Sequence, residues 1–268
     1  MRFLLKTTLI LFRTIPASIA CAALLLPAAC AADWEFSSTV NYDTGRYGSK
    51  DRVDSVYIPL TLKLKYYDAD FSVTAPYLRQ SSRGQVTRVG GKPVRVNTGK
   101  AGGENIAESG LGDILLSGAY TLKLDGPKSF DLALAGRLKL PAANKNKGLG
   151  TGELDEGAGL EFAKEVSPGL TLLSDGYFTI IGDPDGIDFN NEVMLDVGFY
   201  CPLRKNIGLT VLYETRSAIL DGNSDPRSVS GTLSYGASGG TQFAGGVTLG
   251  MSDGSPDLSV GAGFSSRF

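Results

Sequence analysis

Histidine is absent from this 268-residue chain, and cysteine is scarce. Without histidine the chain has no Ser-His or Cys-His nucleophile pair and lacks the usual base for neutral pH. Two of the three cysteines, Cys21 and Cys30, lie in an N-terminal apolar stretch, so Cys201 is left without a partner for an intramolecular disulfide. Zinc sites of histidine and cysteine are excluded for the same reason. We therefore expect neither an enzyme nor a cofactor.

Helical patterns are also scarce. No apolar 3.6-residue periodicity persists beyond the first 32 residues, and the mean hydropathy is close to zero, too low for a helical membrane protein. At the N-terminus a basic start precedes an apolar run that ends in Ala29-Cys30-Ala31. This order predicts a cleaved secretory signal peptide over residues 1–31.

Two alternatives exist for the N-terminal segment. The apolar run approaches the length of a transmembrane helix, but it contains Pro16 and Pro27 and dissolves into alanines. A lipoprotein anchor on Cys30 is disfavoured because Pro27 stands where a lipobox has leucine. Cleavage would take the formal net charge from −2 to −5, since three basic residues leave with the signal. An acidic chain without a basic cluster gives no indication of nucleic-acid binding.

Residues 32–268 are long enough for one all-β domain. Their apolar residues alternate with polar ones in a regular succession of segments, which is the period-2 signature of strands with one apolar face. The pattern predicts an all-β fold of about twelve antiparallel strands, near 34–47, 54–67, 71–80, 111–123, 129–141, 153–165, 169–181, 192–203, 207–218, 228–237, 241–251 and 257–268.

The connections between these strands alternate in length. Those that follow even-numbered strands are tight turns, whereas those that follow odd-numbered strands are mostly longer, up to the segment 81–110. Short turns at one end and long loops at the other are typical of outer-membrane β-barrels. A soluble sandwich, the alternative fold, has no reason to sort its connections in this way. Three possibilities exist for the segment 81–110. It could fold into the barrel as a constriction, meet lipopolysaccharide outside, or be a solvated loop.

The last strand, Asp257–Phe268, alternates strictly and ends on an aromatic residue. A terminal phenylalanine behind such a strand is typical of outer-membrane barrels, where the assembly machinery recognises it and the strand closes the barrel against the first one. We therefore expect a single transmembrane barrel over 32–268 in the outer membrane of a Gram-negative bacterium. Its expected partners are membrane lipid, lipopolysaccharide and, through Phe268, the barrel-assembly machinery.

Charged residues in the middle of strands lie on the face opposite the apolar one. The lumen face of a membrane barrel holds ions of both signs, whereas its lipid face does not. The side chains predicted to line the lumen are Lys63, Lys65, Asp131, Arg137, Lys139, Glu161, Glu214 and Arg216. Asp155 and Glu161 share this face, and next to Arg137 and Lys139 they indicate structural ion pairs more than a catalytic carboxylate pair.

The segment 182–192 is rich in oxygen ligands. Its side chains Asp183, Asp185, Asp188 and Asn190 form a weak calcium candidate whose spacing loosely echoes the start of an EF-hand loop. The same residue types dominate ordinary turns, which is the alternative interpretation. We expect no other metal site.

A series of short segments, in order along the chain, matches a known family. They are Tyr42 to Tyr47, Val56–Lys65, Val73-Thr74-Ala75-Pro76-Tyr77-Leu78, Ser109-Gly110-Leu111-Gly112-Asp113, Lys139-Leu140-Pro141, Leu149-Gly150-Thr151-Gly152, Gly182-Asp183-Pro184, Met251-Ser252-Asp253-Gly254-Ser255-Pro256-Asp257 and Ser266-Arg267-Phe268. Together they resemble outer-membrane proteins labelled as components of a MetA pathway of phenol degradation, many of which are called transporters. The resemblance implies a barrel and leaves the cargo open.

The residues and the resemblance together leave two functions open. The first is a passive outer-membrane channel for small, hydrophobic or aromatic, molecules. The second is a structural or surface-binding barrel whose lumen is blocked by its own side chains. Barrels of eight strands have filled interiors and those of sixteen have open channels. A count of twelve strands therefore does not distinguish an open channel from a blocked barrel.

Overall fold

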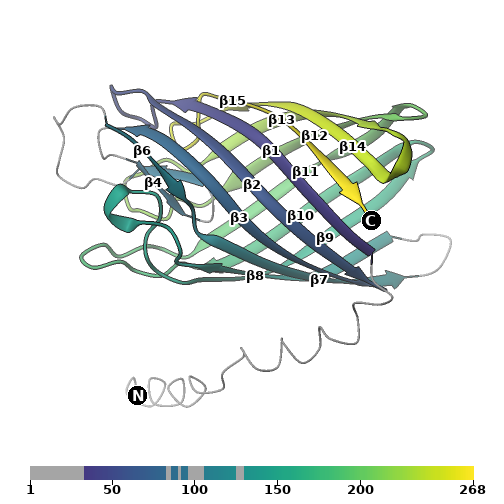
Figure 1. The fold of residues 1–268 in the computed structure, drawn as a ribbon, viewed down its shortest axis with the longest axis horizontal. Helices are drawn as coiled ribbons and strands as arrows, with labels where there is room; N and C mark the ends of the chain where they lie inside the picture. Colours follow the sequence, from purple (N-terminus) through teal and green to yellow (C-terminus); the bar gives the residue numbers. More distant parts are fainter. Residues whose placement is uncertain (1–32, 83–85, 90–91, 96–105, 125–129) are drawn as a thin grey trace, which may run out of the picture.

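The computed structural model describes residues 33–82, 86–89, 92–95, 106–124 and 130–268, and the predicted signal peptide lies outside them. Antiparallel strands make up most of this part of the chain and close into a tilted barrel (Figure 1). None of its helices is long and apolar enough to span a membrane.

The elements follow one another in chain order. The strands are β1 (Asp33–Gly45), β2 (Val53–Tyr66), β3 (Ala69–Ser82), β4 (Val86–Val89), β5 (Lys92–Arg95), β6 (Ile106–Leu111), β7 (Ile114–Leu124), β8 (Phe130–Leu140), β9 (Asp155–Ser167), β10 (Leu170–Ile180), β11 (Glu192–Arg204), β12 (Ile207–Arg216), β13 (Arg227–Gly236), β14 (Thr241–Gly250) and β15 (Leu258–Arg267). Two short 3-10 helices are η2 (Lys145–Lys147) and η3 (Ser238–Gly240).

The barrel closes between β1 and β15. The backbone of Trp34 exchanges two hydrogen bonds with that of Phe268, with N···O distances of 3.2 and 2.9 Å. On the apolar face the ring centroids of Phe36 and Phe264 lie 6.0 Å apart. On the other face of the same two strands, Glu35 accepts a hydrogen bond of 2.9 Å from Arg267. Closure leaves neither β1 nor β15 with a free edge, and lipid cannot satisfy the backbone groups of such an edge.

One strand differs from its prediction. The expected strand 111–123 starts earlier, as β6, and is interrupted at Gly112 and Asp113 before it continues as β7; both halves pair with β3. The interruption lies opposite Pro76, whose carbonyl accepts a hydrogen bond of 2.8 Å from the Gly112 amide. A Cβ at residue 112 would come within 2.9 Å of Pro76 Cγ, so glycine is required there. With β6 and β7 counted as one strand, the barrel has the predicted twelve.

The connections are sorted by length, as predicted. At one end, the short-turn end, strands are joined through 67–68, 125–129, 168–169, 205–206 and 237–240. At the other, the long-loop end, the connections include 46–52, 141–154, 181–191, 217–226 and 251–257. Both termini of the barrel lie at the short-turn end (Figure 1).

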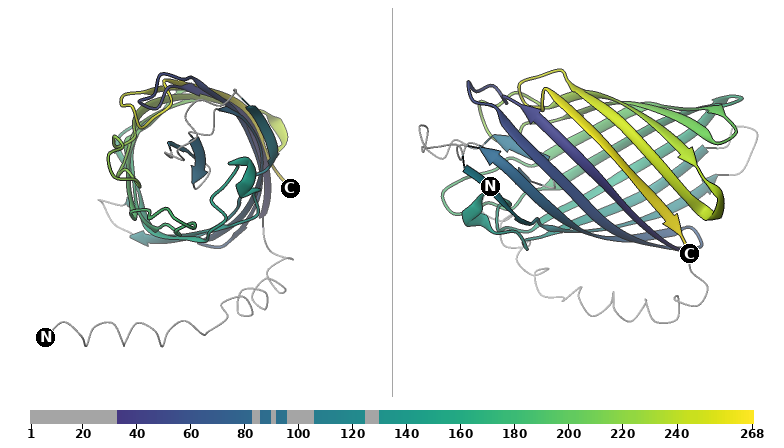
Figure 2. Two further views of the ribbon diagram at one scale, coloured as in Figure 1. Left: turned by 90° about the vertical axis from the view of Figure 1, so that its left-hand side faces the viewer. Right: turned by 45° about the horizontal axis from the view of Figure 1, so that its top comes forward.

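The segment between β3 and β6 is not a plain loop. It contains the two-stranded β4–β5 hairpin, which pairs Val86 with Arg95 and is separate from the barrel sheet. Viewed along the barrel axis, this hairpin lies inside the ring of strands (Figure 2). Of the three possibilities for this segment, the constriction inside the barrel is therefore the one that the described residues adopt.

The outer face of the barrel carries an apolar surface. Leu60, Leu134, Leu160 and Leu233 are each 47–53 % exposed, although they sit within strands and away from the strand ends. A closed barrel with exposed apolar residues is a membrane-spanning structure, because hydrocarbon accepts such residues and cannot accept a free sheet edge.

Leu134→Arg tests this orientation. A charge at mid-wall facing lipid should cost about 2–4 kcal/mol of unfolding free energy in lipid vesicles. Leu154→Arg is the control, since Leu154 is 43 % exposed but lies in a loop. Equal costs for the two variants would show that Leu134 does not face hydrocarbon.

Candidate functional site

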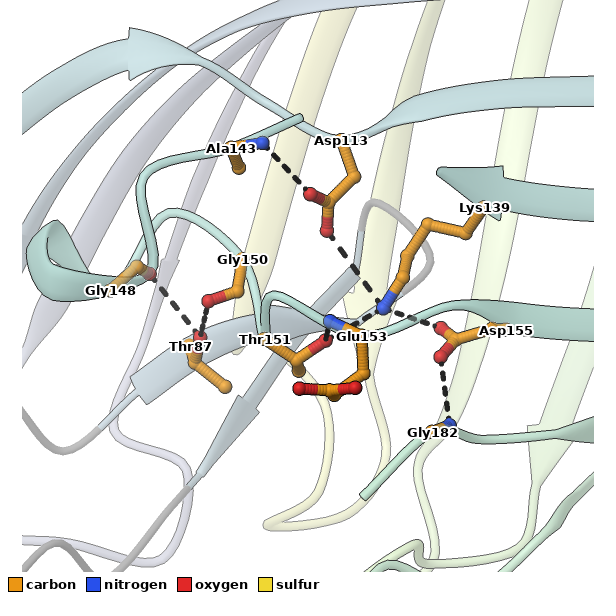
Figure 3. A network of polar contacts seen from close by, with 10 residues as sticks. All are labelled: Thr87, Asp113, Lys139, Ala143, Gly148, Gly150, Thr151, Glu153, Asp155 and Gly182. Carbon is orange, nitrogen blue, oxygen red and sulfur yellow. Dashed lines mark hydrogen bonds and ion pairs between the residues drawn. The ribbon is translucent and has the colours of Figure 1, made fainter. Parts of the chain in front are cut away.

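A buried polar network lies at the long-loop end (Figure 3). The ammonium of Lys139, at the end of β8, is 2.8 Å from Asp155 Oδ2 and 3.8 Å from Asp113 Oδ2, and it donates a hydrogen bond of 2.8 Å to Thr151 Oγ1. The side chains of Lys139, Asp155 and Asp113 are only 2, 4 and 6 % exposed. Buried charges of this kind are tolerated only when they are paired and hydrogen-bonded.

The two carboxylates of this network also hold loop backbone. Asp113 accepts a hydrogen bond of 3.0 Å from the Ala143 amide, and Asp155 accepts one of 3.1 Å from the Gly182 amide. A Cβ on Gly150 would lie 2.6 Å from Asp113 Oδ2, so the loop can approach the carboxylate only through glycine. The network thus joins the β6–β7 interruption, the loop 141–154 and the start of the loop 181–191.

The β4–β5 hairpin is attached to this network on one side. Thr87 lies 3.3 Å from the carbonyl oxygen of Gly148 and 3.5 Å from that of Gly150, with its hydroxyl as donor (Figure 3). On the other side Val94 packs against the buried apolar cluster of Ile181, Phe189 and Ile219. The hairpin is therefore held between the loop 141–154 and two further loops of the long-loop end.

A row of carboxylates crosses the middle of the lumen wall. Glu161, Asp175, Asp196 and Glu214 lie on β9, β10, β11 and β12, each directly opposite the next in the strand register. All four are on the face opposite the exposed leucines and valines, and are half-buried. Like charges directly opposite one another destabilise a sheet, since their Cβ atoms are about 4.5–5.5 Å apart.

Two arginines offset part of this charge. Arg216, whose side chain is 5 % exposed, lies 3.1 Å from Glu192 and 3.2 Å from Glu214. The guanidinium of Arg137 lies 3.4 Å above the ring of Tyr177, and the Tyr177 hydroxyl donates a short hydrogen bond to Glu161. These contacts leave the carboxylate row with more negative than positive charge.

Tyr177 and Arg137 lie flat against the wall. A Cβ on Gly159 would come within 2.4 Å of the Tyr177 ring, and one on Gly157 within 2.8 Å of Arg137 Cγ. The two glycines of β9 therefore make room for the large side chains of the neighbouring strands. Packed in this way, Tyr177 and Arg137 occupy the wall instead of the bore.

The next part of the wall, β13 to β15, has a different character. The inward residues of β13, β14 and β15 are mostly small and, apart from Arg267 at the short-turn end, uncharged; among them are Thr232, Gly246, Thr248, Ser259 and Gly261. Together with Thr39 and Asn41 of β1 they line a shallow groove of about 170 Å³. The lumen thus has one charged wall, β8 to β12, and one uncharged wall, β13 to β15.

The side chains predicted to line the lumen lie on the strand face opposite the exposed leucines, and their role in lining a pore stays a prediction. Lys63 pairs with Asp70 at 3.7 Å near the short-turn end, with Lys65 next on the same face, and Asp131 lies opposite Ala163. Arg137, Glu161, Glu214 and Arg216 belong to the charged wall described above. Lys139 also points inward but is enclosed in the network, where the surrounding loops cover it.

Two of the four residues proposed to bind calcium form hydrogen bonds with loop residues. Asp183 accepts a hydrogen bond of 2.7 Å from the Phe189 amide, and the Asn190 side chain donates one of 2.9 Å to Asp221. Among the described residues, no three His, Cys, Asp or Glu side chains are grouped so as to hold a metal ion. Calcium binding by Asp183, Asp185, Asp188 and Asn190 stays a prediction.

Several residues of these sites were not predicted from the sequence. Asp175 and Asp196 alternate with apolar residues in their strands, so the period-2 pattern alone could have placed them on the inward face. Asp113 stands in a motif segment but at an interruption that the pattern does not show. Nothing in the sequence around Thr87 indicates that its hydroxyl contacts the loop 141–154.

The family comparison agrees with this architecture. Residues 53–268 match the family model described as "Putative MetA-pathway of phenol degradation". The chain belongs to this family. The family resemblance drawn from the short motifs is thereby confirmed. No curated protein sequence is significantly similar to the chain.

Solved structures show the fold that this family member adopts. An outer-membrane channel from Pseudomonas putida F1 has a TM-score of 0.64 at 13 % identity, over 88 % of this chain and 95 % of that one. The NanC porin has a TM-score of 0.53 at 9 % identity, over 87 and 100 % of the two chains. The KdgM porin, in complex with disordered oligogalacturonate, has a TM-score of 0.50 at 9 % identity, over 88 and 99 %. The fold is that of outer-membrane channels and porins, and the chain is an outer-membrane β-barrel.

The family motifs converge in space. Four motif segments that are far apart in the sequence supply residues to the network in Figure 3, namely Asp113, Lys139, Gly150-Thr151 and Gly182. In this chain these motifs therefore supply the contacts that hold the loops of the long-loop end together.

Proposed function

We propose that this protein is a passive outer-membrane channel for small molecules, narrowed at its long-loop end by the β4–β5 hairpin. The observation that carries the proposal is the recessed packing of Tyr177 and Arg137 on Gly159 and Gly157. A barrel filled by its own side chains has no need to keep large residues flat against the wall. The family description supports small aromatic molecules, of the class of phenol, as cargo.

A blocked barrel is the second candidate, and one observation favours it. The hairpin lies within the ring of strands (Figure 2). The hydrogen bond of Thr87 holds it on one side, and the packing of Val94 holds it on the other. Single-channel recording of the refolded protein in planar bilayers separates the two candidates. An open channel gives discrete current steps that aromatic solutes such as phenol modulate, whereas a blocked barrel gives no current.

The carboxylate row predicts the ion preference of such a channel. Rings of charge set selectivity in pores, so the wild-type channel should prefer cations. Asp175→Asn combined with Asp196→Asn should shift the reversal potential in a salt gradient towards that of a non-selective pore. Asp185→Asn, in an exposed loop, should leave it unchanged. A reversal potential that does not respond to the double variant would show that the row lies off the conduction path.

The orientation of the barrel follows from the sorted connections. Outer-membrane barrels place long loops outside and short turns in the periplasm. In a Cys201→Ser background, a cysteine at Asp185 should therefore react with an impermeant maleimide on intact cells. A cysteine at Asn206 should react only after the outer membrane is opened. Reversed labelling would invert the orientation.

A further inference from the structure

A cavity lies between the β4–β5 hairpin and the barrel wall at the long-loop end. Its volume is about 230 Å³, and its lining comes from the hairpin, from the ends of β11 and β12, and from the loops 46–52, 217–226 and 251–257. An engineered cavity of roughly 150 Å³ holds benzene, so this one has space for a single ring with a short substituent. Segments far apart in the chain therefore enclose a space of ligand size.

One side of the cavity is apolar. Pro93 and Val94 of the hairpin face it, together with Tyr47 and Ile219 of the surrounding loops. Tyr47 and Ile219 are each only 3 % exposed, and Val94 and Ile219 belong to the apolar cluster that holds the hairpin. This side is suited to the apolar body of a ligand.

The other side is polar and carries negative charge. Arg216 and Glu192 line the cavity as a buried ion pair, in which Arg216 is 5 % exposed and donates a hydrogen bond of 3.1 Å to Glu192. Arg216 also lies 3.2 Å from Glu214. Its single positive charge therefore faces two carboxylates, and the three side chains together carry a net negative charge. Asp253 adds a further carboxylate to the lining. A ligand group that donates hydrogen bonds or is cationic is therefore favoured here over an anionic one.

We propose that this cavity is a binding site for a compact amphipathic molecule with one ring-sized apolar body and a cationic or hydrogen-bond-donating head group. The apolar body packs against Tyr47, Val94 and Ile219, and the head group points to Glu192. This inference rests on the proposed channel function, because it places the first ligand contact at the mouth of the pore.

Three probes with the same ring and different head groups test the proposal. They are benzylamine, benzyl alcohol and benzoate, titrated calorimetrically at neutral pH into the refolded full-length barrel in detergent, with protein-free micelles as blank. Benzylamine should bind most tightly and benzoate most weakly, and the two should differ by about tenfold or more, the ratio that a charge-assisted hydrogen bond typically gives. Equal affinities, or a preference for benzoate, would overturn the proposal.

Two variants locate the binding. Ala218→Phe places a ring in the cavity that Ala218 lines, and should abolish benzylamine binding. Ala142→Phe is the control, since Ala142 is exposed at the same end and does not line the cavity. Glu192→Gln should reduce the ratio between benzylamine and benzoate. Unchanged binding to Ala218→Phe would overturn the site even if the variant folds normally.

The outcomes separate this site from the proposed function. A barrel that conducts ions but does not bind benzylamine keeps its channel function and lacks the site. A barrel that binds benzylamine with the expected preference but carries no current retains the site and is not a channel.

Discussion

Lys139→Met is expected to lower the free energy of unfolding by about 3–5 kcal/mol, the usual cost of removing one partner of a buried ion pair. The reason is that Asp155 and Asp113 would remain as buried carboxylates with no cation beside them. Urea unfolding in lipid vesicles, followed by the gel mobility of the folded barrel, measures the change. Since the network holds the loop 141–154, to which Thr87 of the hairpin is attached, the variant should also conduct more than the wild type.

The matched control is Lys147→Met. Lys147 pairs with Glu108 at 3.1 Å, but the two side chains are 44 and 36 % exposed. An exposed pair of this kind contributes about 0–1 kcal/mol, so its loss should be small. A cost for Lys139→Met no greater than that for Lys147→Met would contradict a structural role of the network. Asn at both Asp113 and Asp155 should recover part of the loss in the Lys139→Met background, because it removes the unpaired charges.

Gly159→Ala is expected to destabilise the barrel and to narrow its bore. The new Cβ would lie 2.4 Å from the Tyr177 ring and 2.5 Å from the Gly176 carbonyl oxygen, so both the side chain and the wall must move. Overpacking of this kind costs about 1–3 kcal/mol. Once displaced, Tyr177 projects into the lumen, and single-channel conductance should fall.

Gly231→Ala is the control for this variant, because nothing lies within 4 Å of a Cβ at residue 231 of β13. It should alter neither the stability nor the conductance. The double variant Gly159→Ala with Tyr177→Ala should regain conductance while the part of the instability caused by the Gly176 carbonyl persists. If Gly159→Ala conducts like the wild type, Tyr177 does not border the bore.

The fold was largely predictable because the sequence pattern that indicates it, the alternation of apolar and polar residues, can be recognised within each strand. Alternation of apolar and polar residues depends only on neighbours two positions apart, and it predicted twelve strands and the sorting of the connections. The interruption at Gly112 and Asp113 was not predictable in this way. It depends on Pro76, which lies on a different strand and faces the interruption only in the folded barrel.

The candidate sites were predictable only in part. Alternation placed Glu161 and Glu214 on the inward face. The carboxylate row forms only because the pairing of four strands sets their acidic residues opposite one another. The sequence of a single strand does not determine that pairing register. The β4–β5 hairpin escaped detection because each of its strands has four residues, too few to display a period. The ion pair of Lys139 and Asp155 follows from alternation, since the two residues are direct partners on β8 and β9. The part that Asp113 and the loop 141–154 play in the network was not predictable, because Asp113 stands at the interruption and the sequence does not show the path of the loop.

The unequal walls of the lumen have an electrical consequence. Carboxylates gather on β9 to β12, whereas the inward residues of β13 to β15 carry no charge apart from Arg267 at the short-turn end, so the electrostatic potential changes from one side of the bore to the other. Low-dielectric walls concentrate such a field. A polar solute between the walls therefore experiences a torque that turns the positive end of its dipole toward β9 to β12. Passage then depends on how the solute is oriented as well as on its size, and two isomers of equal volume but different dipole direction should cross at different rates.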